Sequence, residues 1–293
     1  MAQFDDRLFK IVFSYTKNGQ PTQLTLDGGL DIKAHGMQYV NAIQDECSLV
    51  ISNLKRETRD TLATQLTQWT YDQERKSVQV YAGRVSTGVS LLYTGDIIRC
   101  VASQPPNIDL HIKSKTAQFW KYSLLKQAMA IDSNLSQIAQ QSADSMGLTL
   151  QFEATDATIM NYCYTGSAIK QIDKLNAIGG IDAFVDGNTL VVKNKNVARS
   201  GTVPIISAQT GMIGIPEMTE YGVRIRTLLS NACKIGGKFQ LISTSNPLLN
   251  DNYLIYQMGF EIASRDTPFY TILEAARSIH GYMGPSSLGL PNA

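Results

Sequence analysis

GMIGIPEMTEYGVRIRTLL, residues 211–229, is the stretch from which the fold of this chain is most readily inferred. It begins as an apolar segment spaced by glycines up to Pro216, and residues 223–227 then alternate between β-branched and arginine side chains. Such alternation predicts a strand with one buried face. The apolar part carries no nucleophile or base, and its nearest acids are Glu217 and Glu220. We therefore interpret it as a loop that forms a docking surface, rather than as a catalytic loop.

Strand patterns also dominate residues 1–112. Apolar and polar side chains alternate over residues 9–15 and again from residue 24, which predicts a hairpin with Asn18 and Gly19 at its tip. Further strands in this part are predicted over residues 47–54, 77–85 and 89–102.

Four helices are predicted. Asn53, Asn134 and Ser167 precede three of them as N-caps, because their side-chain oxygens can accept hydrogen bonds from free backbone amides of a first turn. The fourth helix is predicted over residues 118–130. The first helix would place three apolar side chains on one face, Leu62, Leu66 and Trp69. Glycines end the later helices at Gly147 and at residues 179–180.

The expected fold class is therefore mainly β with an α+β insertion. Within the insertion, a strand is predicted over residues 148–152 and a hairpin that turns at Asp186 and Gly187. Strands are predicted again over residues 238–244, 252–264 and 268–276. The expected domains are a first β domain at 1–112, an α+β module at 113–200, and a second β domain with a flexible C-terminal tail at 201–293.

Composition argues against several classes of protein. The formal net charge is +1, and the densest basic run, residues 55–59, is interrupted by Glu57, so a dedicated nucleic-acid binder is not expected. Four cysteines are too far apart for a zinc site or a small disulfide framework, and we expect buried free thiols in a reducing compartment: Cys47, Cys100, Cys163 and Cys233. The N-terminus lacks the pattern of a signal peptide, and no run approaches the ~18 apolar residues of a membrane span. We expect a soluble chain that is cytoplasmic when made and has no stable membrane association.

The search for chemistry predicts no catalytic, cofactor-binding or metal-binding residue. The three histidines, His35, His111 and His280, lie far apart and have no acidic or cysteine neighbour at ligand spacing. Glu217 and Glu220 are the carboxylate pair most able to meet on one side of a turn, but only Tyr221 supplies an aromatic side chain beside them. Two alternatives stay open: a tail-tip cell-wall hydrolase, or a module for host-surface sugars that displays Tyr81, Tyr93 and Tyr282.

Residues 206–243 and 253–275 carry an ordered series of motifs. The series runs from G-x-I-G-x-P through an aromatic-Gly strand entry and LL-x-N to a glycine-led strand, and it ends in a T-P-aromatic-aromatic-T strand. In this order the motifs resemble the C-terminal β-region of baseplate hub proteins from contractile-tailed bacteriophages. Those hubs are similar to the late control protein D and to the N-terminal part of type VI secretion spike proteins.

The resemblance implies a homotrimer in which each chain supplies two tube-like β-barrel domains, with exchange of strands between the barrels possible. Such a hub adapts a hexameric tail tube to a trimeric spike and lines the channel for the tape-measure protein and DNA. The implied partners are therefore further copies of this chain, a tail tube protein and a separate central spike protein, together with the tape-measure protein and baseplate wedge proteins. The implied location is the tail baseplate of the virion, after assembly in the host cytoplasm.

On this interpretation the opening stretch holds the subunit interface. Methionine and isoleucine fill irregular gaps between subunits, while small residues let backbones approach closely. Charged residues fit the rim, where they set register and association rate, although Arg224 and Arg226 also fit the water-facing side of a half-buried strand. The candidate interface residues are Met212, Ile213, Ile215, Tyr221, Arg224 and Arg226.

Overall fold

The computed structural model describes residues 5–17, 19–27, 29–41, 43–65, 75–86, 88–121, 123–128, 132–265 and 267–277. Contacts divide the chain into two compact units. Unit 1 comprises Met1–Met37, Asp45–Phe119 and Phe260–Tyr270, and unit 2 comprises Gln38–Gln44, Trp120–Gly259 and Thr271–Ala293. Each unit is assembled from separate segments of the sequence, so the two units do not coincide with the three contiguous domains expected from the sequence. Whether residues 1–112, 113–200 and 201–293 fold independently stays a prediction.

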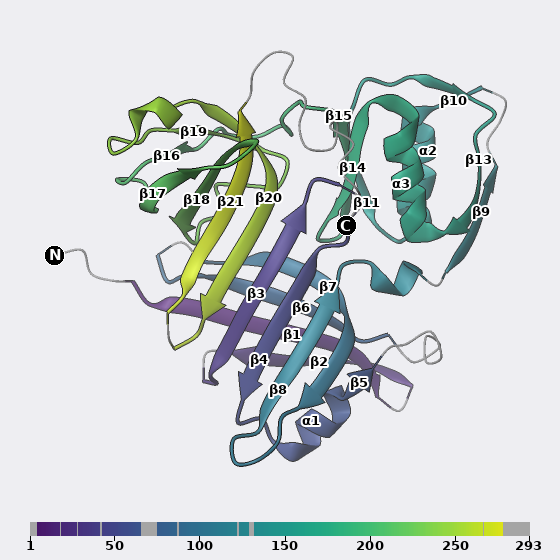
Figure 1. Ribbon diagram of the computed structural model, residues 1–293. Helices are drawn as coiled ribbons and strands as arrows, with labels where there is room; N and C mark the ends of the chain where they lie inside the picture. Colours follow the sequence, from purple (N-terminus) through teal and green to yellow (C-terminus); the bar gives the residue numbers. More distant parts are fainter. Residues whose placement is uncertain are drawn as a thin grey trace. The chain divides into compact units, whose positions relative to one another are not determined.

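Unit 1 is built on an antiparallel sheet with the strand order β2-β1-β6-β7-β8-β4-β3, drawn in purple and blue in Figure 1. Its strands are β1 (Arg7–Lys17), β2 (Gln20–Asp27), β3 (Ile32–Tyr39), β4 (Glu46–Ser52), β6 (Ser77–Arg84), β7 (Gly88–Ala102) and β8 (Asp109–Lys115), and the short β5 (Thr64–Gln65) pairs with β7. The predicted first hairpin is confirmed as β1 and β2. Asn18 lies outside the described residues.

The core of unit 1 follows from the alternation along its strands. Cys47, Leu49 and Ile51 on β4 are buried, while the residues between them are more exposed. Gly36 on β3 packs closely against Phe260 of the same unit, because a Cβ atom there would lie 2.2 Å from the Phe260 ring. Only glycine fits at this position without displacing that ring.

The first predicted helix is shorter than expected. Helix α1 spans Arg56–Leu62 and buries Leu62, but Asn53 is not its N-cap: this residue has a φ of 60° and lies before Lys55, which precedes the helix. A left-handed backbone is common for asparagine in turns, so a turn rather than a cap accounts for this residue. Leu66 and Trp69 lie outside the described residues.

Among its described residues, the α+β part of unit 2 contains two α-helices and three small sheets. Its elements are β9 (Leu124–Ala128), β10 (Asp132–Asn134), α2 (Leu135–Ser145), β11 (Thr149–Glu153), β12 (Thr158–Met160), β13 (Cys163–Ser167), α3 (Ala168–Gly179), β14 (Ile181–Asp186) and β15 (Thr189–Asn194). They follow η1 (Gln118–Lys121), of which Gln118 and Phe119 belong to unit 1. Strand β11 pairs in parallel with β15, and β15 pairs antiparallel with β14. Asn134 and Ser167 occupy the predicted N-cap positions of α2 and α3, and Gly180 ends α3 with a φ of 63°.

The helix predicted over residues 118–130 is wrong. This segment forms the single 3₁₀ turn η1 and then strand β9, which pairs antiparallel with β13 from Leu124 to Ala128. Leucine and lysine are good helix formers, but helix propensity is worth only a few tenths of a kcal/mol per residue. Pairing with a distant strand and burial of Gln127 outweigh it here.

The remaining β part of unit 2 confirms the strands predicted beyond residue 200. It contains β16 (Ile205–Ile206), β17 (Met212–Met218), β18 (Gly222–Leu228), β19 (Lys238–Leu241), η2 (Pro247–Leu249), β20 (Asn252–Ala263) and β21 (Phe269–Arg277). Strands β17, β18, β21 and β20 follow one another, and β19 links β20 to β16. Residues 260–263 and 269–270, at the ends of β20 and β21, belong to unit 1.

The sheet of β11, β15 and β14 is buried on both faces within unit 2. On one face Ala183, Leu190 and Val192 pack with α2 and α3. On the other, Phe184 and Val191 belong to a core that also holds side chains of β18, β19, β20 and β21. The α+β part and the β part of unit 2 therefore share apolar side chains.

Candidate functional site: the edge strand β17

Strand β17 is the first strand in the order of unit 2, and β18 is its only partner among the described strands. The segment predicted as a loop is therefore a strand, and the chain turns after Met218 instead of at Pro216. A bulge between Ile213 and Glu217 interrupts the pairing, and Gly214 within it has a φ of 77°, which favours glycine. An edge strand presents unpaired backbone groups, and these can accept a strand of another chain.

The apolar side chains of β17 fall into two groups. Met212 packs against the core of unit 2 and Pro216 is buried, so both stabilise the unit itself. Ile213 is half-buried, whereas Ile215 is 64% exposed and Met218 is 73% exposed. Met218 was not among the predicted interface residues, and its only signal in the sequence is an apolar side chain beside the turn. The edge of β17 thus offers an apolar surface centred on Ile215 and Met218.

The predicted rim residues, Arg224 and Arg226, both lie on β18, the strand next to β17. Arg224 on β18 is exposed, and its Nε lies 3.6 Å from a carboxylate oxygen of Glu274 on β21. The Tyr256 hydroxyl donates to the same carboxylate at 3.4 Å, and the ring of Tyr221 meets that of Tyr256 edge-on at 6.4 Å. Arg226 is also exposed on β18. Tyr221 and Arg224 therefore form a polar and aromatic cluster with β20 and β21.

The other candidate residues lie apart from one another. Glu217 and Glu220 are both exposed, on either side of the end of β17. His35 lies 3.7 Å from Glu261, His111 is exposed on β8, and His280 is outside the described residues. Within the described ranges, no group of three or more His, Cys, Asp or Glu side chains could hold a metal ion. No helix in those ranges is long and apolar enough to cross a membrane.

The structure argues against Tyr93 as part of a sugar-binding module and corrects the expected burial of Cys163. Tyr93 is buried in unit 1, so it cannot display its ring to a sugar, and Tyr282 lies outside the described residues. Cys47 and Cys100 are buried as predicted, but Cys163 is exposed. Burial raises the pKa of the Cys47 thiol far above its usual range and that of Cys100 to about 12, so both stay protonated at neutral pH.

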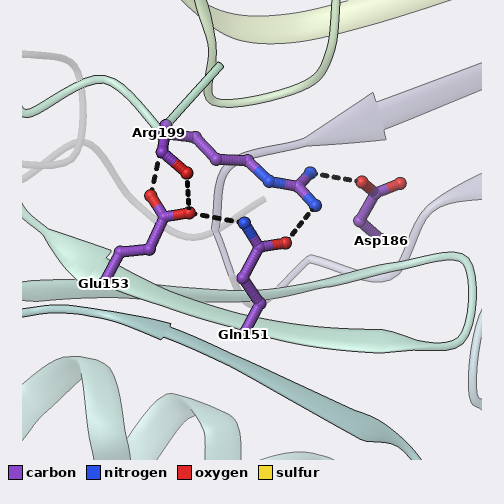
Figure 2. A network of polar contacts seen from close by, with 5 residues as sticks. Gln151, Glu153, Asp186 and Arg199 are labelled. Atoms are coloured by element: carbon purple, nitrogen blue, oxygen red, sulfur yellow. Dashed lines mark hydrogen bonds and ion pairs between the residues drawn. The ribbon is translucent and has the colours of Figure 1, made fainter.

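A polar network fixes the segment that leads from the α+β part into β16 and β17 (Figure 2). The Arg199 guanidinium donates to Asp186 Oδ2 and to Gln151 Oε1, each at 2.5 Å. Gln151 Nε2 in turn donates to Glu153 Oε1 at 2.5 Å, and the Ser200 amide donates to Glu153 Oε2 at 2.7 Å. Burial raises the pKa of Glu153, but the hydrogen bonds from Ser200 and Gln151 and the Arg199 charge outweigh it and lower the pKa.

The Arg199 end of this network is removed from water, because the Arg199 side chain is only 9% exposed, whereas the Ser200 end is exposed. The Arg199 amide also donates to the Gly236 carbonyl at 2.8 Å, and Gly236 lies just before β19. One residue thus joins the sheet of the α+β part to the β part of unit 2. The hydrogen bonds of Arg199 thus hold the segment that precedes β16 in place, and β17 follows β16 along the chain.

Almost the entire chain matches one family of known proteins. The family profile described as baseplate hub gp41 matches residues 8–275. The chain belongs to this family of phage baseplate hub proteins. The resemblance inferred from the motifs of the C-terminal region is thereby confirmed, and it extends over almost the entire chain. A comparison with curated protein sequences gives no significant match.

Solved structures agree with the fold of this hub protein. It is similar to a 43 kDa tail protein of prophage MuSo2 from Shewanella oneidensis, with a TM-score of 0.62 and 10% identity over 92% of this chain and 97% of that one. A tail protein from Neisseria meningitidis MC58 gives 0.60 and 11% identity over 91% and 96%. The E. coli c3393 protein, a component of the type VI secretion system, gives 0.56 and 8% over 85% and 74%. The predicted mainly β fold with an α+β part is confirmed.

Proposed function

We propose that this protein forms the hub of a phage baseplate as a homotrimer that adapts the hexameric tail tube to a trimeric spike. Its role is structural and not catalytic, with each chain supplying two tube-like β-barrel domains around a central channel. The support for the hub is the family profile over residues 8–275. The support for self-association is the edge of β17, where Ile215 and Met218 are exposed beside unpaired backbone.

The proposed interface has an apolar centre and a charged rim. Ile213, Ile215 and Met218 supply the centre, because they lie on β17 and are not fully buried by their own unit. Arg224 and Arg226 lie one strand away, where exposed charges influence the rate of association more than its final affinity. Interfaces of permanent assemblies bury roughly 2,000 Å² or more and are more apolar than transient ones.

The proposed partners follow from the position of a hub. They are the tail tube protein on one side and a separate central spike protein on the other, with the tape-measure protein and DNA in transit through the channel. Baseplate wedge proteins are the remaining proposed partners. We further propose that the chain is made in the host cytoplasm, works in the tail of the virion and has no stable association with a membrane.

Sedimentation velocity of the purified chain tests the proposal. The chain has a mass of 32.2 kDa, and the expected species has three times that mass, either alone or after tube and spike proteins are added. A chain that stays monomeric with both partners present would refute the trimer. Catalysis is tested separately by incubation with purified peptidoglycan, where release of soluble fragments would refute a purely structural role.

A further inference from the structure

One face of the sheet in unit 1 gathers basic side chains from distant parts of the sequence. Strands β3, β4, β8 and β7 follow one another in this sheet (Figure 1). Ala34, Cys100 and Ile112 on three of them are buried in the core. Successive side chains of a strand point to opposite faces, so the sequence neighbours of these residues lie on the other side of the sheet. Those neighbours are exposed and basic, and we call them the basic face: Lys33, Arg99, His111 and Lys113.

The strand register brings the four residues of the basic face close together. Arg99 on β7 lies directly opposite Lys113 on β8, and directly opposite side chains have Cβ atoms about 4.5–5.5 Å apart. His111 precedes Lys113 by two residues on the same face, about 7 Å along the strand. Lys33 and His111 flank Val50 of β4 from its two sides. The sequence gives no sign of this grouping, because strand pairing alone creates it.

Arg99 and Lys113 are an unfavourable pair within the single chain. Like charges directly opposite each other destabilise a sheet. Among the described residues, neither side chain forms an ion pair with a carboxylate. A local conflict of this kind is expected where a surface is used for binding. An anionic group that contacts both side chains would relieve their repulsion.

The acidic residues around the basic face are placed toward its borders. Glu46 is the first residue of β4, and its carboxylate lies 3.4 Å from the Lys115 ammonium. Glu261 on β20 lies 3.7 Å from His35. Asp109 is the first residue of β8, four residues before Lys113. The carboxylates of Glu46 and Glu261 therefore have basic partners of their own, and the centre of the basic face keeps its positive charge.

We propose that the basic face contacts the phosphodiester backbone of duplex DNA. The inference rests on the hub function proposed above, which brings DNA past this chain, and it names the residues that meet the DNA. Lysine and arginine bind phosphates without reading the base sequence, and proteins held by such contacts can slide along DNA. Three charged contacts give weak binding, which suits DNA in transit. They also agree with a chain of net charge +1 that is not a dedicated nucleic-acid binder.

DNA fits the basic face better than an acidic protein does. The core of a protein interface is formed by exposed aromatic and aliphatic side chains. Among the described residues, no large hydrophobic side chain of β3, β4 or β8 is exposed, and Val50 and Val101 between the basic residues are half-buried. Interfaces with DNA are more polar and more positively charged than those between proteins.

The test measures binding of a fluorescein-labelled duplex of about 20 bp, of arbitrary sequence, by fluorescence anisotropy over a series of salt concentrations. The Arg99→Gln/Lys113→Gln variant is compared with Lys170→Gln/Lys174→Gln, which removes the same charge from two exposed lysines of α3. Thermal unfolding verifies that each is folded. Each lost contact makes the slope of log K against log salt shallower by about 0.9, so we expect the first variant to lose about 2 from a slope of about −3. Its affinity at about 0.1 M salt should fall on the order of fiftyfold, and the α3 variant should bind like the wild type.

Lys33→Gln is the second variant, because it changes one strand only and does not touch the pair of β7 and β8. It should make the slope shallower by about 1. Wild-type affinity and slope in folded Arg99→Gln/Lys113→Gln or in Lys33→Gln would overturn the inference, and so would an equal loss in the α3 variant. Polyglutamate serves as an acidic polypeptide probe. A wild type that binds polyglutamate but leaves DNA free at low salt would assign the basic face to an acidic protein and overturn the contact with DNA.

Sedimentation velocity on the same samples separates this inference from the hub function. A wild type that forms trimers but does not bind the duplex overturns the contact with DNA and leaves the homotrimer standing. A wild type that binds the duplex through Arg99 and Lys113 but stays monomeric with tube and spike proteins refutes the homotrimer and supports the basic face.

Discussion

Replacement of Ile215 by aspartate is the sharpest test of the edge of β17. Ile215 is 64% exposed, so the change removes little from the core of the single chain. Ile213 is half-buried beside the bulge, and a charge there would also disturb the hairpin of β17 and β18. The Ile215 variant therefore separates association from folding better than a change at Ile213.

The expected magnitude follows from the exposed part of the side chain. Complete burial of an isoleucine stabilises by about 1.5–3 kcal/mol, and roughly two thirds of this remains available to an interface at Ile215. Aspartate loses that contribution of about 1–2 kcal/mol and brings an unpaired charge into an apolar contact, at a cost of several kcal/mol more. Each contact then weakens by at least about 3 kcal/mol, more than a hundredfold, and a trimer contains three of them.

Sedimentation velocity over a concentration series measures this effect directly. Val85→Asp is the matched control, because Val85 is 59% exposed and belongs to unit 1, whereas β17 belongs to unit 2. We expect the control to form trimers like the wild type and the Ile215 variant to sediment as a monomer at the same concentration. A folded Ile215→Asp variant that forms trimers as tightly as the wild type would refute the role of β17.

Further predictions concern the charged residues and thiols. Arg224→Ala should slow association and reduce its salt dependence while changing the final affinity little, because the Arg224 side chain is exposed and lies 3.6 Å from its partner Glu274; stopped-flow mixing at two salt concentrations measures this. Arg199→Ala should lower the free energy of unfolding by about 2 kcal/mol in urea titrations, because it leaves partly buried acceptors without a donor, and unchanged stability would contradict the role of the network. Glu217→Ala should leave phage particles infectious in a plaque assay, and loss of infection by normally assembled particles would indicate a missed active site. A thiol reagent at neutral pH should modify Cys163 rapidly and Cys47 only after unfolding, because Cys47 is buried and its raised pKa keeps it protonated; rapid labelling of Cys47 in mass spectrometry would contradict its burial.

Local signals in the sequence predicted those parts of the fold that local physics decides. Asn134 begins α2 because its backbone amide donates to Gln137 Oε1 at 3.3 Å, an interaction between residues three positions apart. Gly180 ends α3 because the chain there requires a positive φ, which glycine adopts without strain. The alternation along β18 likewise gave the correct buried face, with Val223 and Ile225 in the core.

Interactions between distant segments account for what the sequence did not reveal. Strand β9 exists because β13 pairs with it, and no pattern within residues 118–130 announces that partner. Gln151, Asp186 and Arg199 come from three separate segments, and their meeting depends on the parallel pairing of β11 with β15. Met218 could not be chosen as an interface residue before the turn between β17 and β18 was located.

The edge of β17 combines features that protect exposed strands, Pro216 and a bulge, with exposed apolar side chains that do not. Such strands usually carry lysines or inward-pointing charges, or are very short, so that they do not pair with other chains. Strand β17 spans seven residues, and Glu217 is its only charged side chain. Its bulge at Gly214 interrupts pairing with β18, but Ile215 and Met218 remain exposed there. A single chain with this edge is prone to associate, and a closed ring removes the problem because each edge is covered by a neighbour. The exposure of Ile215 and Met218 in spite of Pro216 and the bulge is therefore an argument that this strand is covered in the working assembly.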